Sequence, residues 1–329
     1  MDFRLSEDQL ALQSGIRSFC DGRFPFETLA ELEQNRAFDR ELWGELAEMG
    51  VFALRLPEAE GGVELGYADA VIVFAELGRR LVPGPLVWSH LAVGLVEGAA
   101  DGTAVVGGVD AITDPPGSGP IIVEHLEHLD ALIVLREEGV FRVDPCSLEA
   151  EALPEPLDPL TPVHHVRALP EGERVGDAAR AATLWQGGAV LTAALCLGIC
   201  EATLLEANEY AMKREQFGRP IGGFQAIKHL LSDMFVRQEV ARAAAYAAGA
   251  TLDHPEVGDP IRSAATAKLL AGQNAVRNAR GCIQVYGGMG YTWEMPPHWY
   301  WKRAWVHGQV FGRAADHEER IAERITAPA

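Results

Sequence analysis

Arg214 is the residue whose type and position most clearly suggest a chemical role, because it stands where one helical pattern ends and another begins. The first pattern runs from about Leu191 and breaks at Gly218 and Pro220, after which apolar residues resume at helical spacing. The planar fork and permanent charge of an arginine match the oxygens of a phosphate. This helix-turn-helix corner, Tyr210 to Gln225, therefore suits a phosphate, although such a corner, taken alone, is more often a solvated arginine beside a C-capping glycine.

A second glycine-rich turn downstream supports the same interpretation. The segment from Cys282 to Thr292 reads Cys-Ile-Gln-Val-Tyr-Gly-Gly-Met-Gly-Tyr-Thr, a helix end followed by clustered glycines. It is not the dinucleotide-binding fingerprint of a Rossmann fold, because a helix and not a strand precedes the glycines. Glycine nevertheless lets the main chain approach a ligand closely and present N–H groups to it.

Both segments resemble the acyl-CoA dehydrogenase family. The C-terminal helical domain of that family carries an Arg-x-x-Phe-Gly-x-Pro-Ile-x-x-Phe-Gln corner and a Gln-x-Tyr/Phe-Gly-Gly-x-Gly-Tyr turn, and both are present here. The N-terminal part is similar to the family as well, in Leu5-Ser6-Glu7-Asp8-Gln9, Leu56-Pro57-Glu58, Glu76-Leu77-Gly78-Arg79 and Pro83-Gly84-Pro85.

The resemblance implies an FAD cofactor that two subunits share. In the family, the middle β-domain of one subunit holds the flavin ring, while the C-terminal domain of its neighbour holds the pyrophosphate and adenosine half. Carried over by motif, the residues that would face that half are Arg214, Gln216, Phe217, Gln225, Gln284, Gly287 and Gly288.

The family's catalytic base is missing from both of its usual positions. The resemblance places the glutamate that abstracts the acyl α-proton at Gly312 near the C-terminus, or at Gly188 early in the long helix. An arginine that lies along the CoA tail in many members falls on Ala189. We therefore expect no catalytic residue in this chain, although a slip in this count would leave Asp316 or Glu318 as a displaced base.

The middle segment also departs from the family. Family members have a Thr-Glu-Pro-x-x-Gly-Ser-Asp-type segment and a later Trp-Ile-Thr/Ser segment that hold the flavin ring, and this sequence has neither. The span between Leu95 and Asp177 is also shorter than usual. We therefore expect that this chain does not hold a flavin ring in its own β-domain.

The sequence predicts an α+β protein that is mainly α, in three parts. Residues 1–95 alternate amphipathic helical stretches with short breaks and predict an N-terminal helical domain. Residues 96–178 predict a reduced middle β-domain, a small antiparallel sheet or partial barrel whose last strand is Val163 to Leu169. Residues 179–329 predict a C-terminal four-helix bundle, in which a stripe of small residues over 261–283 favours an oligomer interface.

Bulk composition excludes several classes of function. A net charge of −19 argues against nucleic acid as a partner. No apolar run approaches the roughly 20 residues of a membrane span, and the charged opening is not a signal peptide, so we expect a cytoplasmic protein without a membrane partner. Five scattered cysteines are typical of reduced, mostly buried thiols. His125 and His128 lack a third converging ligand, so we expect no metal site.

Together these features predict the small subunit of a heteromeric, FAD-dependent acyl-CoA dehydrogenase, similar to the paired actinobacterial enzymes that act on steroid-derived acyl-CoAs. A larger acyl-CoA dehydrogenase subunit, in a two-plus-two assembly, would supply the flavin-ring site, most contacts to the acyl-CoA substrate and the catalytic glutamate. Two alternatives stay open. One is a self-sufficient homo-oligomeric acyl-CoA dehydrogenase with a relocated base, and the other is a non-catalytic assembly subunit without flavin.

Overall fold

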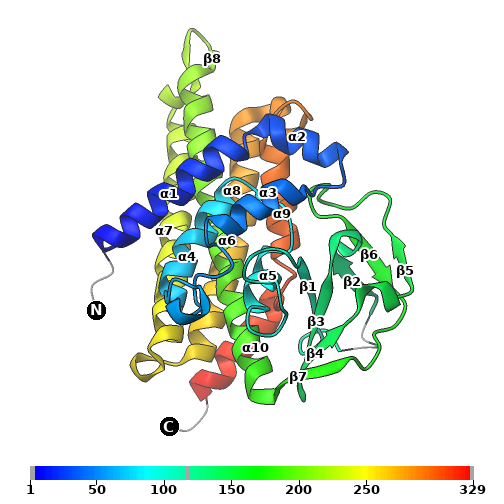
Figure 1. Cartoon of the computed structure of the whole chain (residues 1–329). Helices are drawn as coiled ribbons and strands as arrows, with labels where there is room; N and C mark the ends of the chain where they lie inside the picture. Colours follow the sequence, from blue (N-terminus) through cyan, green and yellow to red (C-terminus); the bar gives the residue numbers. More distant parts are fainter. Residues whose placement is uncertain (1–3, 116, 118, 327–329) are drawn as a thin grey trace. The chain divides into compact units, whose positions relative to one another are not determined.

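The computed structural model describes residues 4–115, 117 and 119–326 of the chain. These residues form two compact units (Figure 1). The first unit contains the residues up to Phe26, Val71–Val82 and the residues from Val190 onward; the second contains Glu27–Ala70 and Pro83–Ala189. The division into domains at residues 95 and 178 stays a prediction.

The N-terminal region is helical, as predicted. The first helix begins at a capping box, in which the Ser6 hydroxyl accepts from the Gln9 N–H and the Gln9 side chain accepts from the Ser6 N–H. Asp39 caps the third helix by accepting from two backbone N–H groups of its first turn. The helices of this region are α1 (Glu7–Arg23), α2 (Phe26–Gln34), α3 (Arg40–Glu48), α4 (Tyr67–Arg79) and α5 (Leu86–Leu91).

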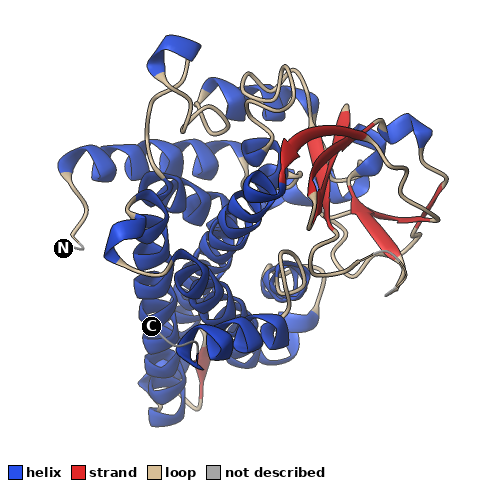
Figure 2. Cartoon of the chain, turned by 90° about the horizontal axis from the view of Figure 1, so that it is seen from below, coloured by secondary structure: helices blue, strands red, loops and turns tan. Residues whose placement is uncertain are grey.

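The middle region contains two small sheets (Figure 2). The first has the strand order β1-β3-β4-β7, and the second has the order β2-β6-β5. The predicted antiparallel arrangement is wrong for one pair, because β1 and β3 run parallel, with Val106 opposite Ala131. The strands are β1 (Val106–Asp110), β2 (Ile121–Glu124), β3 (Ala131–Arg136), β4 (Gly139–Val143), β5 (Ala150–Ala152), β6 (Val163–Val166) and β7 (Glu173–Asp177).

Two edge strands of these sheets, β5 and β7, lack an apolar pattern. β5 consists of Ala-Glu-Ala with every residue exposed, and β7 reads Glu-Arg-Val-Gly-Asp with no buried residue. Edge strands that face solvent need no apolar alternation, so the sequence carries no periodic signal for them. The expectation that the strand beginning at Val163 is the last one is therefore wrong, since β7 follows it.

The C-terminal region consists of long helices, as predicted. Many of the small side chains of α8 are buried within the chain, whereas Ile261, Leu269 and Val276 are only partly buried. The expected oligomer interface along the stripe over 261–283 stays a prediction. The elements are α6 (Ala178–Lys213), β8 (Glu215–Gln216), β9 (Arg219–Pro220), α7 (Gln225–Asp253), α8 (Pro260–Tyr286), the 3-10 turn η6 (Gly287–Tyr291), α9 (Pro297–His307) and α10 (Ala314–Thr326).

Helix α6 corrects the expectation that no apolar run is long enough to cross a membrane. It contains 36 residues, and by length and composition its apolar part could span a bilayer. However, 83% of its most apolar window is buried inside the protein, as in the core helix of a globular domain. The cytoplasmic location stays a prediction.

Candidate functional site

Arg214 lies directly after the last residue of α6, at the base of the short hairpin formed by β8 and β9. This hairpin projects beyond the ends of α6 and α7 (Figure 1). The Arg214 N–H donates to the carbonyl of Tyr210 at 2.8 Å, and its carbonyl accepts from the Ile221 N–H at 2.8 Å. The backbone of the corner is therefore fixed, while the guanidinium side chain is exposed.

The other predicted residues of this corner also face solvent. Gln216 and Gln225 are exposed, and Phe217 at the hairpin tip is 92% exposed. Phe217 and Gly218 have φ angles of 53° and 79°, which a tight hairpin turn of this hand requires. The exposed Phe217 ring is therefore available for apolar contact with another molecule.

The glycine turn after α8 has the same exposed character. Gln284, Gly287 and Gly288 are exposed, and Gly287 has a φ of 62°. A Cβ atom at Gly288 would meet no atom within 4 Å, whereas one at Gly290 would lie 2.9 Å from the Ile283 carbonyl oxygen. Packing within the chain therefore requires glycine at position 290 but not at position 288.

The structure brings these two segments together. The rings of Tyr210, four residues before Arg214, and Tyr286, directly before Gly287, stack with their centroids 3.9 Å apart and their planes at 16°. Around them lies an apolar cluster of Ala207, Ala211, Met234, Cys282 and Val285, against which Leu204, Ile221, Ile227, Leu230, Leu231 and Met295 pack. The end of α6, which Arg214 follows, therefore packs against the end of α8, which Gly287 follows.

The position expected for a catalytic glutamate near the C-terminus has a different character. Phe311 and Gly312 have φ angles of 53° and 92°, in the left-handed region that favours glycine. The buried Lys268 donates to the Gly312 carbonyl at 3.1 Å, and Nε2 of the buried His317 lies 3.0 Å from the Phe311 carbonyl oxygen. Burial lowers the pKa of His317 to about 4, so its neutral imidazole donates to that carbonyl at pH 7. This loop is held by its own chain.

The remaining candidates for a base or an acyl-CoA contact offer little for chemistry. Gly188 and Ala189 are buried in α6. The Asp316 carboxylate accepts from the Arg313 N–H at 2.8 Å, as a helix-capping group does. Glu318 is exposed on α10. The structure therefore gives neither acidic residue a catalytic setting.

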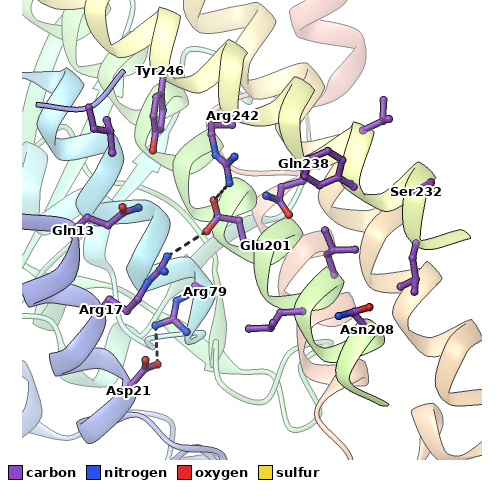
Figure 3. Close-up of a pocket in the computed structure, with 16 residues that line it drawn as sticks. Gln13, Arg17, Asp21, Arg79, Glu201, Asn208, Ser232, Gln238, Arg242 and Tyr246 are labelled. Atoms are coloured by element: carbon purple, nitrogen blue, oxygen red, sulfur yellow. Dashed lines mark hydrogen bonds and ion pairs between the residues drawn. The ribbon is translucent and has the colours of Figure 1, made fainter. Parts of the chain in front are cut away.

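A cavity of about 1060 Å³ lies elsewhere in the first unit, between α1, α6 and α7 (Figure 3). Its charged groups pair with one another: Arg17 lies 3.8 Å from Glu201, Arg242 lies 2.6 Å from Glu201, and Arg79 lies 2.7 Å from Asp21. These pairs link α1 to α4 and to α6, and α6 to α7. We assign no ligand to the cavity. Exposed apolar side chains at its edge are Leu205, Phe235 and Val236.

The histidine, cysteine and acidic side chains bear on the expectations about metals and thiols. No group of three or more His, Cys, Asp or Glu residues in the described part of the chain could hold a metal ion. All five cysteines are free thiols, and only Cys146 is exposed, so the predicted burial is confirmed for the other four. Sequence reasoning missed Glu206, which accepts from the Tyr286 hydroxyl at 3.0 Å and lies four residues before Tyr210.

Family comparison covers most of the chain in two segments. Residues 6–102 match the N-terminal domain of acyl-CoA dehydrogenases, and residues 179–326 match the C-terminal domain. FAD is the cofactor of this family, which agrees with the cofactor expected from the motifs.

Individual relatives agree with this assignment. Acyl-CoA dehydrogenase IpdE2 of Mycobacterium tuberculosis is 33% identical over 92% of both chains. Acyl-CoA dehydrogenase FadE34 of the same organism is 33% identical over 88% of this chain but only 42% of its own length. A chain of the ChsE4-ChsE5 complex from M. tuberculosis superposes over the full length of both chains with a TM-score of 0.86 and 26% identity. The protein therefore belongs to the acyl-CoA dehydrogenase family.

Proposed function

We propose that this protein is the small subunit of a heteromeric, FAD-dependent acyl-CoA dehydrogenase. It contributes the contacts to the ADP half of FAD, while a larger acyl-CoA dehydrogenase subunit supplies the flavin-ring site, the acyl-CoA pocket and the catalytic glutamate. The reaction is the α,β-dehydrogenation of an acyl-CoA to a 2-enoyl-CoA.

The observation that carries this proposal is the exposed surface made by Arg214, Gln284 and Gly288. Its residues fit the ADP half of FAD: a guanidinium matches phosphate oxygens bidentately, and an amide side chain can bond to phosphate or sugar groups. Gly288 supports this fit, because no packing within the described chain requires a glycine there. Its missing side chain leaves room for a pyrophosphate to approach the backbone N–H groups.

The task of this chain would be binding and orientation. When bound, FAD supplies the redox chemistry by accepting the β-hydride of the acyl-CoA. Arg214 would neutralise the charge of the pyrophosphate, and Gln216, Gln225 and Gln284 would fix its orientation by hydrogen bonds. Phe217 would cover an apolar part of the bound cofactor or of the partner. We assign no role in proton transfer to any residue of this chain.

The loop at Gly312 supports the assignment of the catalytic base to a partner. A glutamate at this position would have to adopt a φ of 92°, which costs a non-glycine residue about 1–2 kcal/mol. Lys268 and His317 hold the loop by its carbonyls, so relaxation to an ordinary backbone conformation would break these bonds. The change from glutamate to glycine is thus accompanied by a backbone that suits glycine.

Three further observations favour a partner subunit. The first is that the ChsE4-ChsE5 structure, which shares the fold over its full length, is a complex of two different proteins. The second is that FadE34 has more than half of its length outside the match, enough for a second region of subunit size. The third is a set of apolar side chains on α6 and α7 that face solvent in the single chain, namely Leu205, Met212, Phe235, Val236 and Val240.

The first test is the FAD content of the chain expressed alone and together with a candidate larger subunit. We expect a colourless chain alone and a yellow complex with one FAD per pair of subunits. Steroid-derived acyl-CoAs are the first substrates to assay with that complex, because the paired enzymes that this chain resembles act on them. A yellow homo-oligomer that an acyl-CoA bleaches would instead establish the self-sufficient enzyme, and a colourless complex would establish the assembly subunit.

Arg214→Ala tests the site itself. Removal of a bidentate charge-assisted contact is worth roughly 1.5–3 kcal/mol, so FAD affinity of the complex should fall by about tenfold to a hundredfold. Lys213→Ala is the matched control, because it removes the same charge from the adjacent exposed residue, which pairs with Glu209 at 3.3 Å. Equal FAD affinity in the two variants would sink the assignment of Arg214.

A further inference from the structure

Glu206, Tyr210 and Tyr286, here called the polar joint, connect the two segments of the proposed FAD surface. Glu206, Tyr210 and Arg214 are spaced four residues apart, so they follow one face of the last turns of α6 and the corner beyond it. Tyr286 is the last residue of α8 and reaches across to this face. Its ring stacks on Tyr210, and its hydroxyl donates to the Glu206 carboxylate at 3.0 Å.

The contacts within the polar joint fix one relative orientation of its side chains, unlike the contacts of the apolar cluster around it. Leu204, Ile221 and Met295 could pack in several orientations, but a stacked ring pair with a bonded hydroxyl has one geometry. A carboxylate in this setting loses hydration, so apolar packing alone would favour a leucine in place of Glu206. Tyr286 is only 8% exposed, so the hydrogen bond lies in a region where loss of one partner is costly.

Both tyrosines are coupled to a segment that faces the proposed ligand, and Glu206 acts through its hydrogen bond with Tyr286. The carbonyl of Tyr210 accepts from the Arg214 N–H at 2.8 Å, and Tyr286 is bonded covalently to Gly287. A tilt of the Tyr286 ring would therefore move the glycine turn relative to the guanidinium. Bidentate recognition of a phosphate tolerates little movement, because its two hydrogen bonds require both groups in place.

We infer that Glu206, Tyr210 and Tyr286 are positioning residues that set the spacing between the Arg214 corner and the Gly287–Gly288 turn for FAD. The inference rests on the proposed function, since it assumes that both segments contact the same cofactor. None of the three residues is assigned a direct contact with FAD. They act by holding in place the groups that do contact FAD.

The experiment measures the FAD dissociation constant of the assembled complex, at a temperature where every variant is folded. Tyr286→Phe keeps the stack and removes the hydroxyl, and we expect FAD binding to weaken by about threefold to tenfold. Tyr210→Leu removes the stack, and a loss of about tenfold is expected. Two conservative variants should rescue: Tyr210→Phe keeps the stack, and Glu206→Gln keeps an oxygen that accepts from Tyr286.

Tyr300→Phe is the control for a purely structural effect. The buried Tyr300 hydroxyl donates to the Arg79 carbonyl at 3.0 Å, so this variant also deletes a buried tyrosine hydrogen bond in the same unit. It should lower the melting temperature and leave the FAD dissociation constant unchanged.

Two results would overturn the inference. If Tyr286→Phe and Tyr210→Leu change FAD affinity no more than Tyr300→Phe does, while Arg214→Ala weakens it, the joint is structural and the proposed function stands. If Arg214→Ala has no effect, the proposed function fails and the inference fails with it. A drop in affinity for Tyr286→Phe and Tyr210→Leu, with rescue by Tyr210→Phe, supports the inference.

Discussion

The Arg214 surface and the Gly312 loop differ in what their residues do for the chain itself. Around Arg214 and Gly288 the polar groups face solvent, and packing within the described chain does not require a glycine at position 288. Around Gly312 the groups face inward: a buried lysine and a buried histidine bind the backbone, and the glycine fits a left-handed φ. A surface whose polar groups face solvent suits an external ligand. A loop whose backbone is held by buried side chains suits the proposal that the catalytic base belongs to a partner subunit.

The same difference is consistent with the proposed function, in which the chain keeps contacts to the cofactor and has no catalytic base. The two sets of groups lie on different elements, so a change at the start of α10 leaves the corner after α6 intact. In an assembly that shares each cofactor between subunits, only one subunit needs the base. Under the proposed function, the Arg214 surface binds FAD only together with the partner subunit, so the strongest tests are made on the complex.

The largest expected effect is that of Gly288→Leu. A leucine side chain here would enter the space from which a cofactor would approach the backbone, so FAD content of the complex should fall to near zero. The isolated chain should keep its melting temperature, because a Cβ at this position meets no atom within 4 Å. Absorption at the flavin bands and differential scanning calorimetry measure the two outcomes.

Gly290→Ala is the paired control within the same turn. Its Cβ would lie 2.9 Å from the Ile283 carbonyl oxygen, so the turn must shift, and we expect a loss of stability of about 1–3 kcal/mol. Full FAD content in Gly288→Leu would contradict the external role of this glycine. Loss of stability in Gly288→Leu comparable to that in Gly290→Ala would remove the distinction between the two positions.

A smaller effect is expected when a glutamate is placed at position 312, where the resemblance puts the catalytic base. Gly312→Glu should lower the free energy of unfolding by about 1–2 kcal/mol, because a glutamate is strained at a φ of 92°. It should add no dehydrogenase activity to the isolated chain. Ala314→Glu, at the exposed first residue of α10, adds the same charge without the strain and should unfold like the natural chain.

An active, FAD-loaded homo-oligomer of Gly312→Glu would reverse the interpretation of this loop. It would show that the chain holds a complete site and lacks only the carboxylate. Turnover with an acyl-CoA and an artificial electron acceptor, measured beside thermal unfolding, decides between the two outcomes.

The features that depend on residues close together in the chain were predictable from the sequence. The Arg214 corner and the Gly287–Gly288 turn are short motifs with fixed spacing, and capping residues such as Ser6 act within one turn. The sequence predicted a helical domain from residue 179, and α6 begins at Ala178. Clear helical periodicity begins only at about Leu191, since α6 is apolar on most of its faces and crosses Gly187 and Gly188.

Contacts between distant segments were beyond the reach of sequence spacing. Tyr210 and Tyr286 are far apart in the chain, and their stacking depends on how α6 and α8 pack. The parallel pairing of β1 with β3 likewise depends on the whole sheet rather than on either strand. The left-handed backbone at Gly312 was also unseen, although the glycine was noted, because a glycine does not reveal its own φ.

The smallest effect concerns the support beneath the Arg214 surface and depends on pH. Burial raises the pKa of Glu206 above its ordinary value of 4.5, an effect that Glu209 reinforces and that the Tyr286 hydrogen bond, Arg80 and Lys213 oppose. A carboxyl group whose folded pKa is raised contributes stability when protonated, at low pH, and loses it as the pH rises through the folded pKa. The melting temperature of Glu206→Gln relative to the natural chain should therefore rise from pH 4.5 upward and then level off.

The Tyr286→Phe background sharpens this test, because the hydroxyl is the donor that stabilises the charged form of Glu206. Without it the carboxylate is less favourable, and the gain from Glu206→Gln should be larger and should appear over a wider pH range. The effect stays small, since Glu206 is only partly buried and solvent screens its charge. A difference in melting temperature that is flat with pH, or that falls as pH rises, would show that the joint holds the Arg214 surface by packing alone.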